Sequence, residues 1–336
     1  MSSSYEHIKR VARQTKPSLS YRGRDFIGWR KEARAKLSEL LGMDQFQLVA
    51  PEVEIEFERH IEGATEIRFS FQSEQGFRTP CHLLLPDGVE NPPVMICLQG
   101  HTSGMHLSLG RPYNEEDVER LQANHAMTGD GDFCIRAVKE GFAAVAMEMR
   151  SRGETDIEKL GCYETAMTAL LVGRTLIGER VWDVSRLIDV LQTSFADRVD
   201  AGTICCMGHS GGGTATAYTA ALEDRLKLVV SSGAMCAFTE SIAARRHCSC
   251  NYVPRVANYF EMNDLMAMAC PKFFVQVCGE LDHGFYIAGS DAVFTAGHRA
   301  YEDNGVEDRS VYIRHPLGHR FMADEVWPVV HRMLGK

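Results

Sequence analysis

The chain has 336 residues, of which 45% are hydrophobic and 24% charged, close to the composition of an average globular protein. No apolar run approaches the length of a membrane span, the first ten residues lack the apolar core of a secretory signal, and the net charge of −9 argues against a nucleic-acid partner. Eleven cysteines, several inside predicted buried strands, are better explained as reduced thiols than as a disulfide scaffold, so we expect a cytoplasmic location.

Apolar side chains recur at helical spacing over residues 26–41. This pattern predicts a helix that lies on the body of the protein. The chain shows no repeat and no flexible linker. We therefore expect an N-terminal helical extension over residues 1–45 and a single α/β domain over residues 46–336.

Strand patterns follow the predicted helix. Residues 53–58 alternate between apolar and charged side chains, which predicts a half-exposed strand. Residues 65–71 and 77–85 are joined by Glu74-Gln75-Gly76, which predicts a hairpin. After Pro86, buried strands alternate with helices, and this order is typical of a mostly parallel central sheet with helices on both faces.

A glycine-containing loop, Gln99-Gly100-His101-Thr102-Ser103-Gly104, follows the predicted buried strand at residues 93–98. Gly100 lets another group approach the backbone closely. The N–H of His101, or that of Thr102 as the second choice, can then donate a hydrogen bond at this edge of the sheet. Residues 105–131 follow; they are polar, show no clear period, and are expected to frame a pocket.

The most informative motif is Gly208-His209-Ser210-Gly211-Gly212. An apolar strand precedes it and a run of small residues that opens a helix follows, as a nucleophile elbow requires. A serine on so sharp a turn has strained backbone angles, and its neighbours must be small. We predict Ser210 as the nucleophile of acyl transfer. The N–H groups of Gly211 and His101 are then the predicted donors to the oxyanion.

A serine nucleophile needs a base and an acid, which follow it in the order Ser, Asp or Glu, His. Asp282, after the predicted strand at residues 271–278, is our choice for the acid, with Glu280 as the fallback. His319, on the loop after the last predicted strand, is our choice for the base. His315 is interpreted as structural, and His283 comes too early in the chain, although it could bind substrate.

The segment from residue 235 to 269 contains Arg245-Arg246-His247-Cys248-Ser249-Cys250. His247, Cys248 and Cys250 could bind a metal, but a structural zinc site usually has wider cysteine spacing and a second ligand pair. We expect a turn beside the active site and no metal or other cofactor. The two arginines could recognise an anionic substrate, although a solvated pair is the simpler interpretation.

The chain resembles the α/β-hydrolase superfamily, and within it the dienelactone hydrolase and acetyl xylan esterase-like branch. The resemblance covers most of the chain from about Phe26 onward and rests on the elbow and on several further segments. These are residues 29–42, 79–86, 171–178, 182–191 and 247–254. The chain departs from the branch in its oxyanion loop, which has no H-G-G-G or R-G-Q sequence, and at Glu148-Met149-Arg150, where many relatives carry Asp and a glycine-rich turn.

This resemblance and the motifs together predict a serine esterase that hydrolyses a small carboxylic ester, such as an acetylated sugar, without a cofactor. One alternative is a serine peptidase on the same fold, although the chain has no N-terminal propeller to select peptides. Another alternative is a catalytically dead hydrolase scaffold that only binds its ligand. The sequence specifies neither the acyl group nor the alcohol, and it leaves a homo-oligomer open.

Overall fold

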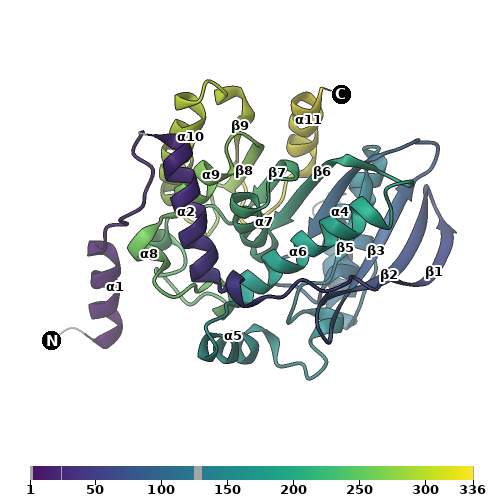
Figure 1. Ribbon diagram of the computed structural model, residues 1–336, viewed down its shortest axis with the longest axis horizontal. Coiled ribbons are helices and arrows are strands. Elements are labelled where there is room, and N and C mark those ends of the chain that lie inside the picture. The colour runs from purple at the N-terminus through teal and green to yellow at the C-terminus, as the bar shows by residue number, and fades with distance from the viewer. Residues whose placement is uncertain (1–2, 24, 125–130, 336) are drawn as a thin grey trace.

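The computed structural model describes residues 3–23, 25–124 and 131–335. Within these residues nine strands form one sheet in the order β1-β2-β3-β5-β4-β6-β7-β8-β9 (Figure 1). The strands are β1 (Glu54–Ile61), β2 (Ala64–Glu74), β3 (Phe77–Pro86), β4 (Pro93–Leu98), β5 (Ala143–Met147), β6 (Asp200–His209), β7 (Leu226–Ser232), β8 (Phe273–Gly279) and β9 (Ser310–His315).

The sheet has an antiparallel and a parallel part. Strands β1, β2, β3 and β5 pair antiparallel, whereas β5, β4, β6, β7, β8 and β9 all run parallel. Every residue of β4 and β5 is buried, as expected for central strands that are covered on both faces. The α/β-hydrolase fold with a mostly parallel central sheet is therefore confirmed, as is the predicted hairpin of β2 and β3.

Helices cover both faces of the sheet. One hydrophobic cluster joins the sheet to α2, α6, α7, α9 and α10, and a second joins its other face to α4 and α11. The helices are α1 (Ser4–Gln14), α2 (Phe26–Leu41), α3 (Glu115–Asn124), α4 (Phe133–Lys139), α5 (Gly161–Leu171), α6 (Leu176–Thr193), α7 (Gly211–Leu222), α8 (Val256–Tyr259), α9 (Met262–Ala269), α10 (Ile287–Asp303) and α11 (Ala323–Leu334).

The first helices precede the sheet in the chain. Helix α2 has the predicted bounds and buries Ala33, Leu37, Leu40 and Leu41 against the core, whereas α1 buries no residue. The segment expected to lack a period contains a 3-10 turn at Met105–Leu109 and then α3; its residues 125–130 lie outside the described residues. In the described part of the chain, no helix combines the length and the hydropathy needed to cross a membrane.

Candidate active site

Ser210 lies between the end of β6 and the start of α7, at the centre of the carboxyl edge of the sheet. Its backbone angles, φ 56° and ψ −119°, are strained for a residue with a side chain. A Cβ atom on Gly208 would lie 2.4 Å from the carbonyl carbon of Gly212, and one on Gly212 would lie 2.1 Å from the Leu98 carbonyl oxygen. The two glycines are thus required by close packing of strand against helix, and this packing holds the sharp turn at Ser210.

Asp282 and His319 form a hydrogen-bonded pair beside this turn. Asp282, on the loop after β8, is 3% exposed, and its Oδ2 lies 2.6 Å from Nδ1 of His319. Its Oδ1 accepts hydrogen bonds from the backbone N–H groups of Gly284 at 2.7 Å and Phe285 at 3.1 Å. Burial alone would raise the pKa of Asp282, but the hydrogen bonds from His319 and the two N–H groups lower it below its ordinary value. Asp282 is therefore an anion that orients the imidazole.

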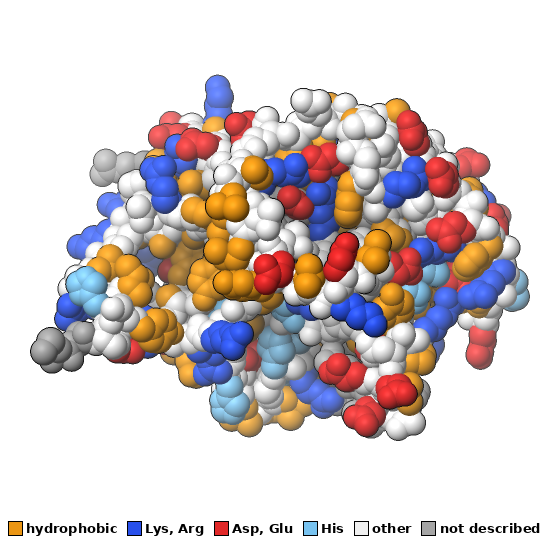
Figure 2. All heavy atoms as spheres, turned by 90° about the horizontal axis from the view of Figure 1, so that it is seen from below, with side chains coloured by type: hydrophobic (Ala, Val, Ile, Leu, Met, Phe, Trp, Pro, Cys, Tyr) orange, Lys and Arg blue, Asp and Glu red, His pale blue; other side chains and the backbone are white. Residues whose placement is uncertain are grey.

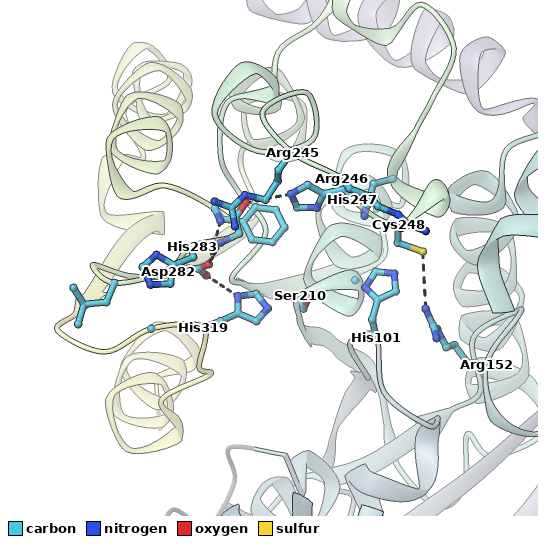
Figure 3. A pocket seen from close by; sticks show the side chains of 16 residues that line it. His101, Arg152, Ser210, Arg245, Arg246, His247, Cys248, Asp282, His283 and His319 are labelled. Atoms are coloured by element: carbon cyan, nitrogen blue, oxygen red, sulfur yellow. Dashed lines mark hydrogen bonds and ion pairs between the residues drawn. The ribbon is translucent and has the colours of Figure 1, made fainter. Parts of the chain in front are cut away.

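The His319 ring is held between two aromatic rings. Phe285 stacks on it at 5.8 Å between ring centroids with an interplanar angle of 11°, and His209 lies 4.4 Å away on centroids. Burial lowers the pKa of His209 to about 3, so this neighbour is neutral, and its Nδ1 lies 2.9 Å from Oγ of Ser232. Figure 3 shows Ser210 between the rings of His319 and His101.

The alternative acid and bases lie elsewhere. Glu280 points outward, and its Oε1 accepts from Arg314 at 3.1 Å; almost half of each of these side chains is exposed. His315 is buried at the end of β9, and its carbonyl oxygen accepts from the N–H of Glu280. His283 is exposed and lines the rim of the same pocket as Ser210. Of these candidates, the structure brings Asp282 and His319 together with Ser210.

The loop after β4 packs against the elbow. A Cβ on Gly100 would lie 3.1 Å from Cβ of Ser210, and one on Gly211 would lie 2.6 Å from Cε1 of His101. The N–H of Thr102 donates to the carbonyl oxygen of Gly100 at 2.9 Å, so it is engaged within the loop. Of the two N–H groups predicted as the second donor, that of Thr102 is therefore already paired.

Glu148 supports this loop, and sequence reasoning did not identify it. The side chain is 1% exposed, and its carboxylate accepts from the N–H groups of Met105 at 3.1 Å and Glu154 at 3.2 Å. Burial raises its pKa to about 7, although the two backbone donors act in the opposite direction. The acidic residue at this position was noted as a departure from the resembled branch, but no sequence pattern indicates which backbone groups it contacts.

Ser210, Asp282 and His319 line a pocket of about 780 Å³. Its lining is cationic on one side, where Arg152, Arg245 and Arg246 lie (Figure 3). Arg245 donates to the hydroxyl of Tyr286 and lies over that ring, 4.9 Å from its centroid, whereas Arg246 is exposed. Arg245 and Arg246 therefore lie beside the candidate active site, as predicted for this turn, and Arg152 lines the same pocket.

Apolar side chains lie outside this cationic rim. Figure 2 shows hydrophobic side chains gathered on the face where α5 lies. Exposed members on or beside this helix include Leu160, Tyr163, Met167 and Leu171. A hollow of about 640 Å³ runs between this helix and the turn at residues 246–249. The surroundings of the active site therefore combine arginine side chains with an apolar surface.

The turn with the cysteines lies beside the pocket, as expected, and its side chains point to two different places. His247 turns toward the loop of the catalytic acid, and its Nε2 lies 3.2 Å from the Gly284 carbonyl oxygen. Cys248 and Cys250 instead lie with His101 and Cys162, and the four ligand atoms are all within 4.8 Å of one another. A second group in the described residues, His82, His106 and Glu154, lies at similar spacing.

The second group is already neutralised by neighbouring side chains. Glu154 pairs with Arg68, and His82 lies 2.6 Å from the carboxylate of Glu66. Arginines also contact the cysteine group, so the choice between the two groups rests on their donor atoms. Of these two groups, the cysteine group has the donor set that metal ions prefer.

Known proteins resemble this chain in sequence and in fold. A protein of Bacillus subtilis (strain 168), named "Putative hydrolase YtaP", is 24% identical over 248 residues, which are 72% of this chain and 78% of that protein. A Bacteroides fragilis NCTC 9343 structure described as a "putative acetyl xylan esterase (BF1801)" has a TM-score of 0.81 at 18% identity and covers 99% of this chain and 95% of its own.

A glucuronoyl esterase from Solibacter usitatus has a TM-score of 0.71 at 14% identity and covers 90% of this chain and 92% of its own. These structural likenesses confirm the α/β-hydrolase fold. The sequence model of the Abhydrolase family matches residues 1–212, which include the turn at Ser210. On this match, the chain belongs to the Abhydrolase family.

Proposed function

We propose that the protein is a serine hydrolase of small carboxylic esters that acts through an acyl-serine intermediate. The observation that carries the proposal is the arrangement of three groups in one pocket. Ser210 stands on a strained turn, and Asp282 holds His319 at 2.6 Å beside it. A nucleophile, an orienting acid and a base, in this chain order and on this fold, form the machinery of acyl transfer.

In the first step His319 takes the proton of the Ser210 hydroxyl as its oxygen attacks the ester carbonyl carbon. Asp282, anionic because three hydrogen-bond donors lower its pKa, stabilises the imidazolium that forms. Collapse of the tetrahedral intermediate expels the alcohol, which receives the proton from His319. Water, deprotonated by the same imidazole, then attacks the acyl carbon; the bond to Oγ of Ser210 breaks, Oγ regains the proton from His319, and the carboxylic acid leaves.

The tetrahedral intermediate carries a negative oxygen that needs hydrogen-bond donors. Gly211 is the first residue of α7, and its N–H has no acceptor within its own helix because it lies in the first turn. We assign it and the N–H of His101 as the two donors. The engagement of the Thr102 N–H with Gly100 supports His101 over Thr102.

The substrate we propose is an ester of a sugar, such as an acetylated saccharide. The names of the structural relatives, acetyl xylan esterases and glucuronoyl esterases, support a sugar ester. A pocket of about 780 Å³ is compatible with a small ester and its sugar. A cytoplasmic location, which stays a prediction from cysteine content, would favour soluble sugar fragments over an intact polymer.

Hydrolysis of aryl esters tests the proposal, because the released phenol is measured directly. The protein should hydrolyse an aryl acetate, and Ser210→Ala should reduce kcat/KM by a factor on the order of 10³ or more, since the members of a triad act as a unit. A panel of acyl chain lengths and of acetylated sugars then defines the substrate. A Ser210→Ala variant within about tenfold of the parent rate would rule out the assignment.

Peptide substrates carried in the same panel separate the esterase from the peptidase alternative. A peptidase should cleave an anilide or a short peptide at a rate comparable with the ester. A dead scaffold would turn over neither. If the protein is an esterase, it should hydrolyse the esters but not the peptides, and Ser210→Ala should lose the ester hydrolysis.

A further inference from the structure

The side chains of His101, Cys162, Cys248 and Cys250 meet at the wall of the catalytic pocket. They come from three separate places: the loop after β4, the first turn of α5, and the turn at residues 248–250. Nε2 of His101 lies 3.0 Å from Sγ of Cys250, and all four ligand atoms lie within 4.8 Å of one another. Figure 3 shows His101 with Ser210 on one side and Cys248 on the other.

This spacing fits a tetrahedral metal ion. With metal–sulfur bonds of about 2.3 Å, the sulfur atoms of a tetrahedral zinc site lie about 3.8 Å apart, and sulfur and nitrogen ligands lie slightly closer. The separations in the cluster include one of 3.0 Å and do not exceed 4.8 Å, a range that brackets this spacing. Three cysteines and one histidine are a common ligand set of structural zinc, and four protein ligands leave no open position.

The charges around the cluster favour thiolates. Arg180 is 1% exposed, and its guanidinium contacts the Arg150 carbonyl oxygen at 2.8 Å and Sγ of Cys162 at 3.2 Å. Arg152 lies 3.1 Å from the same sulfur and 4.0 Å from that of Cys248. A buried guanidinium needs an anionic neighbour. A zinc ion with three thiolates and one imidazole has one net negative charge, which gives the buried Arg180 an anionic neighbour.

We propose that His101, Cys162, Cys248 and Cys250 bind one Zn²⁺ ion, which fixes the loop after β4 against the nucleophile elbow. The ring of His101 already lies against Gly211, where an added Cβ would come within 2.6 Å. A metal bond at Nε2 ties this ring to α5 and to the turn at residue 248. The consequence for catalysis rests on the proposed function, because it concerns the oxyanion donor at His101, whereas metal binding does not depend on it.

Metal content of the untagged protein tests the site independently of activity. Purified under reducing conditions, the protein should contain about one zinc per chain by elemental analysis. Cys248→Ser should lose the metal, whereas Cys248→His, which supplies another zinc ligand, should retain it. Cys134→Ser is the matched control, because Cys134 is buried in α4 on the other face of the sheet and should leave the content unchanged.

Cobalt binding provides a second measurement that needs no variant. After removal of the metal with a chelator, the reduced parent protein should take up one Co²⁺ and develop thiolate-to-metal charge transfer and the visible bands of a tetrahedral ion. Absence of zinc together with absence of these bands would overturn the proposal. Equal metal loss in Cys134→Ser and Cys248→Ser, with both variants folded by circular dichroism, would also overturn it.

Discussion

The two sides of Ser210 are built differently. On the acid–base side, Asp282 and His319 come from the loops after β8 and β9, two adjacent strands, and the pair is complete in itself at 2.6 Å. On the oxyanion side, the loop after β4 is held by Glu148, by the packing of His101 on Gly211, and by a cluster whose other members are residues 162, 248 and 250. The acid–base side is formed by loops that follow adjacent strands, whereas the oxyanion side is formed by segments that lie far apart in the sequence.

The two sides differ in what they contribute: one supplies side chains that transfer a proton, and the other holds a backbone segment in position. A catalytic pair has to be exact in distance and protonation, and two neighbouring strand ends provide that with few contacts. The proposed oxyanion donors are backbone N–H groups, whose direction is set by the conformation of the chain around them. We therefore expect substitutions on the acid–base side to remove turnover and those on the oxyanion side to reduce it.

The largest loss is expected for the base. His319→Gln should lower kcat by roughly 10³-fold or more, because the proposed mechanism transfers the serine proton to this imidazole. His315→Gln is the comparison, measured per folded molecule, and should keep most of the activity since His315 lies outside the pocket lining. Inactivity of His315→Gln beside an active His319→Gln would transfer the role to His315.

The acid should come next. Asp282→Asn preserves the shape of the side chain but removes the charge that favours the imidazolium, so turnover should fall by roughly 10²- to 10⁴-fold on an aryl ester. Glu280→Gln is the control, because that carboxylate is exposed and faces Arg314. It should stay within about twofold of the parent, as surface charge changes usually do. The reverse pattern would make Glu280 the acid.

A smaller loss is expected on the oxyanion side. Cys248→Ser should reduce kcat by about tenfold with little change in KM, because removing a whole oxyanion donor costs roughly 10²- to 10³-fold and this change only loosens the loop that carries one. Steady-state kinetics on the aryl ester measure both constants. A parent-like kcat in a metal-free Cys248→Ser protein would separate the cluster from catalysis.

Glu148 should affect stability more than rate. Its pKa is about 7 in the folded chain against an ordinary value of 4.5, so the folded state binds this proton more tightly than the unfolded state. The resulting stabilisation is fully present below pH 4.5 and is lost as the pH rises through 7. Up to roughly 3 kcal/mol of unfolding free energy should be lost over this range.

Urea unfolding of the parent and of Glu148→Gln, at several pH values between 5 and 8, isolates this contribution. The amide resembles the protonated acid, so the variant should lose less unfolding free energy than the parent as the pH rises. Parallel pH profiles would show that Glu148 does not titrate in this range. Other groups, including Glu261 with a raised pKa of about 7, cancel in the comparison.

The acid–base side could be predicted from the sequence because its signals are local. A glycine-flanked serine after an apolar strand indicates the elbow, and the first acidic and histidine loops after the following strands narrow the choice to a few residues. The strands at residues 93–98 and 310–314 were predicted to within a residue of β4 and β9. The sequence did not decide whether Glu280 or Asp282 is the acid, because the direction of a side chain on a loop depends on the backbone angles.

The cysteine cluster could not be predicted in the same way. Its ligands stand at positions 101, 162, 248 and 250, and only the last two are near one another in the chain. His247 is next to Cys248 in the sequence and was therefore considered as a metal ligand with the two cysteines. In the structure its ring contacts the carbonyl oxygen of Gly284 instead. The role of Glu148 could not be predicted for a related reason. Its carboxylate oxygens accept hydrogen bonds from the N–H groups of Met105 and Glu154, which lie in segments whose structure the sequence pattern did not predict.

Covalent labelling tests the central claim, a reactive serine at the elbow, most directly. The protein is incubated with a fluorophosphonate, and the modified residue is identified by intact mass and peptide mapping. We expect a single phosphonyl adduct on Ser210, much slower labelling in His319→Gln, and none in Ser210→Ala. An unlabelled parent protein that is folded, or an adduct that maps to another residue and persists in Ser210→Ala, would contradict the account.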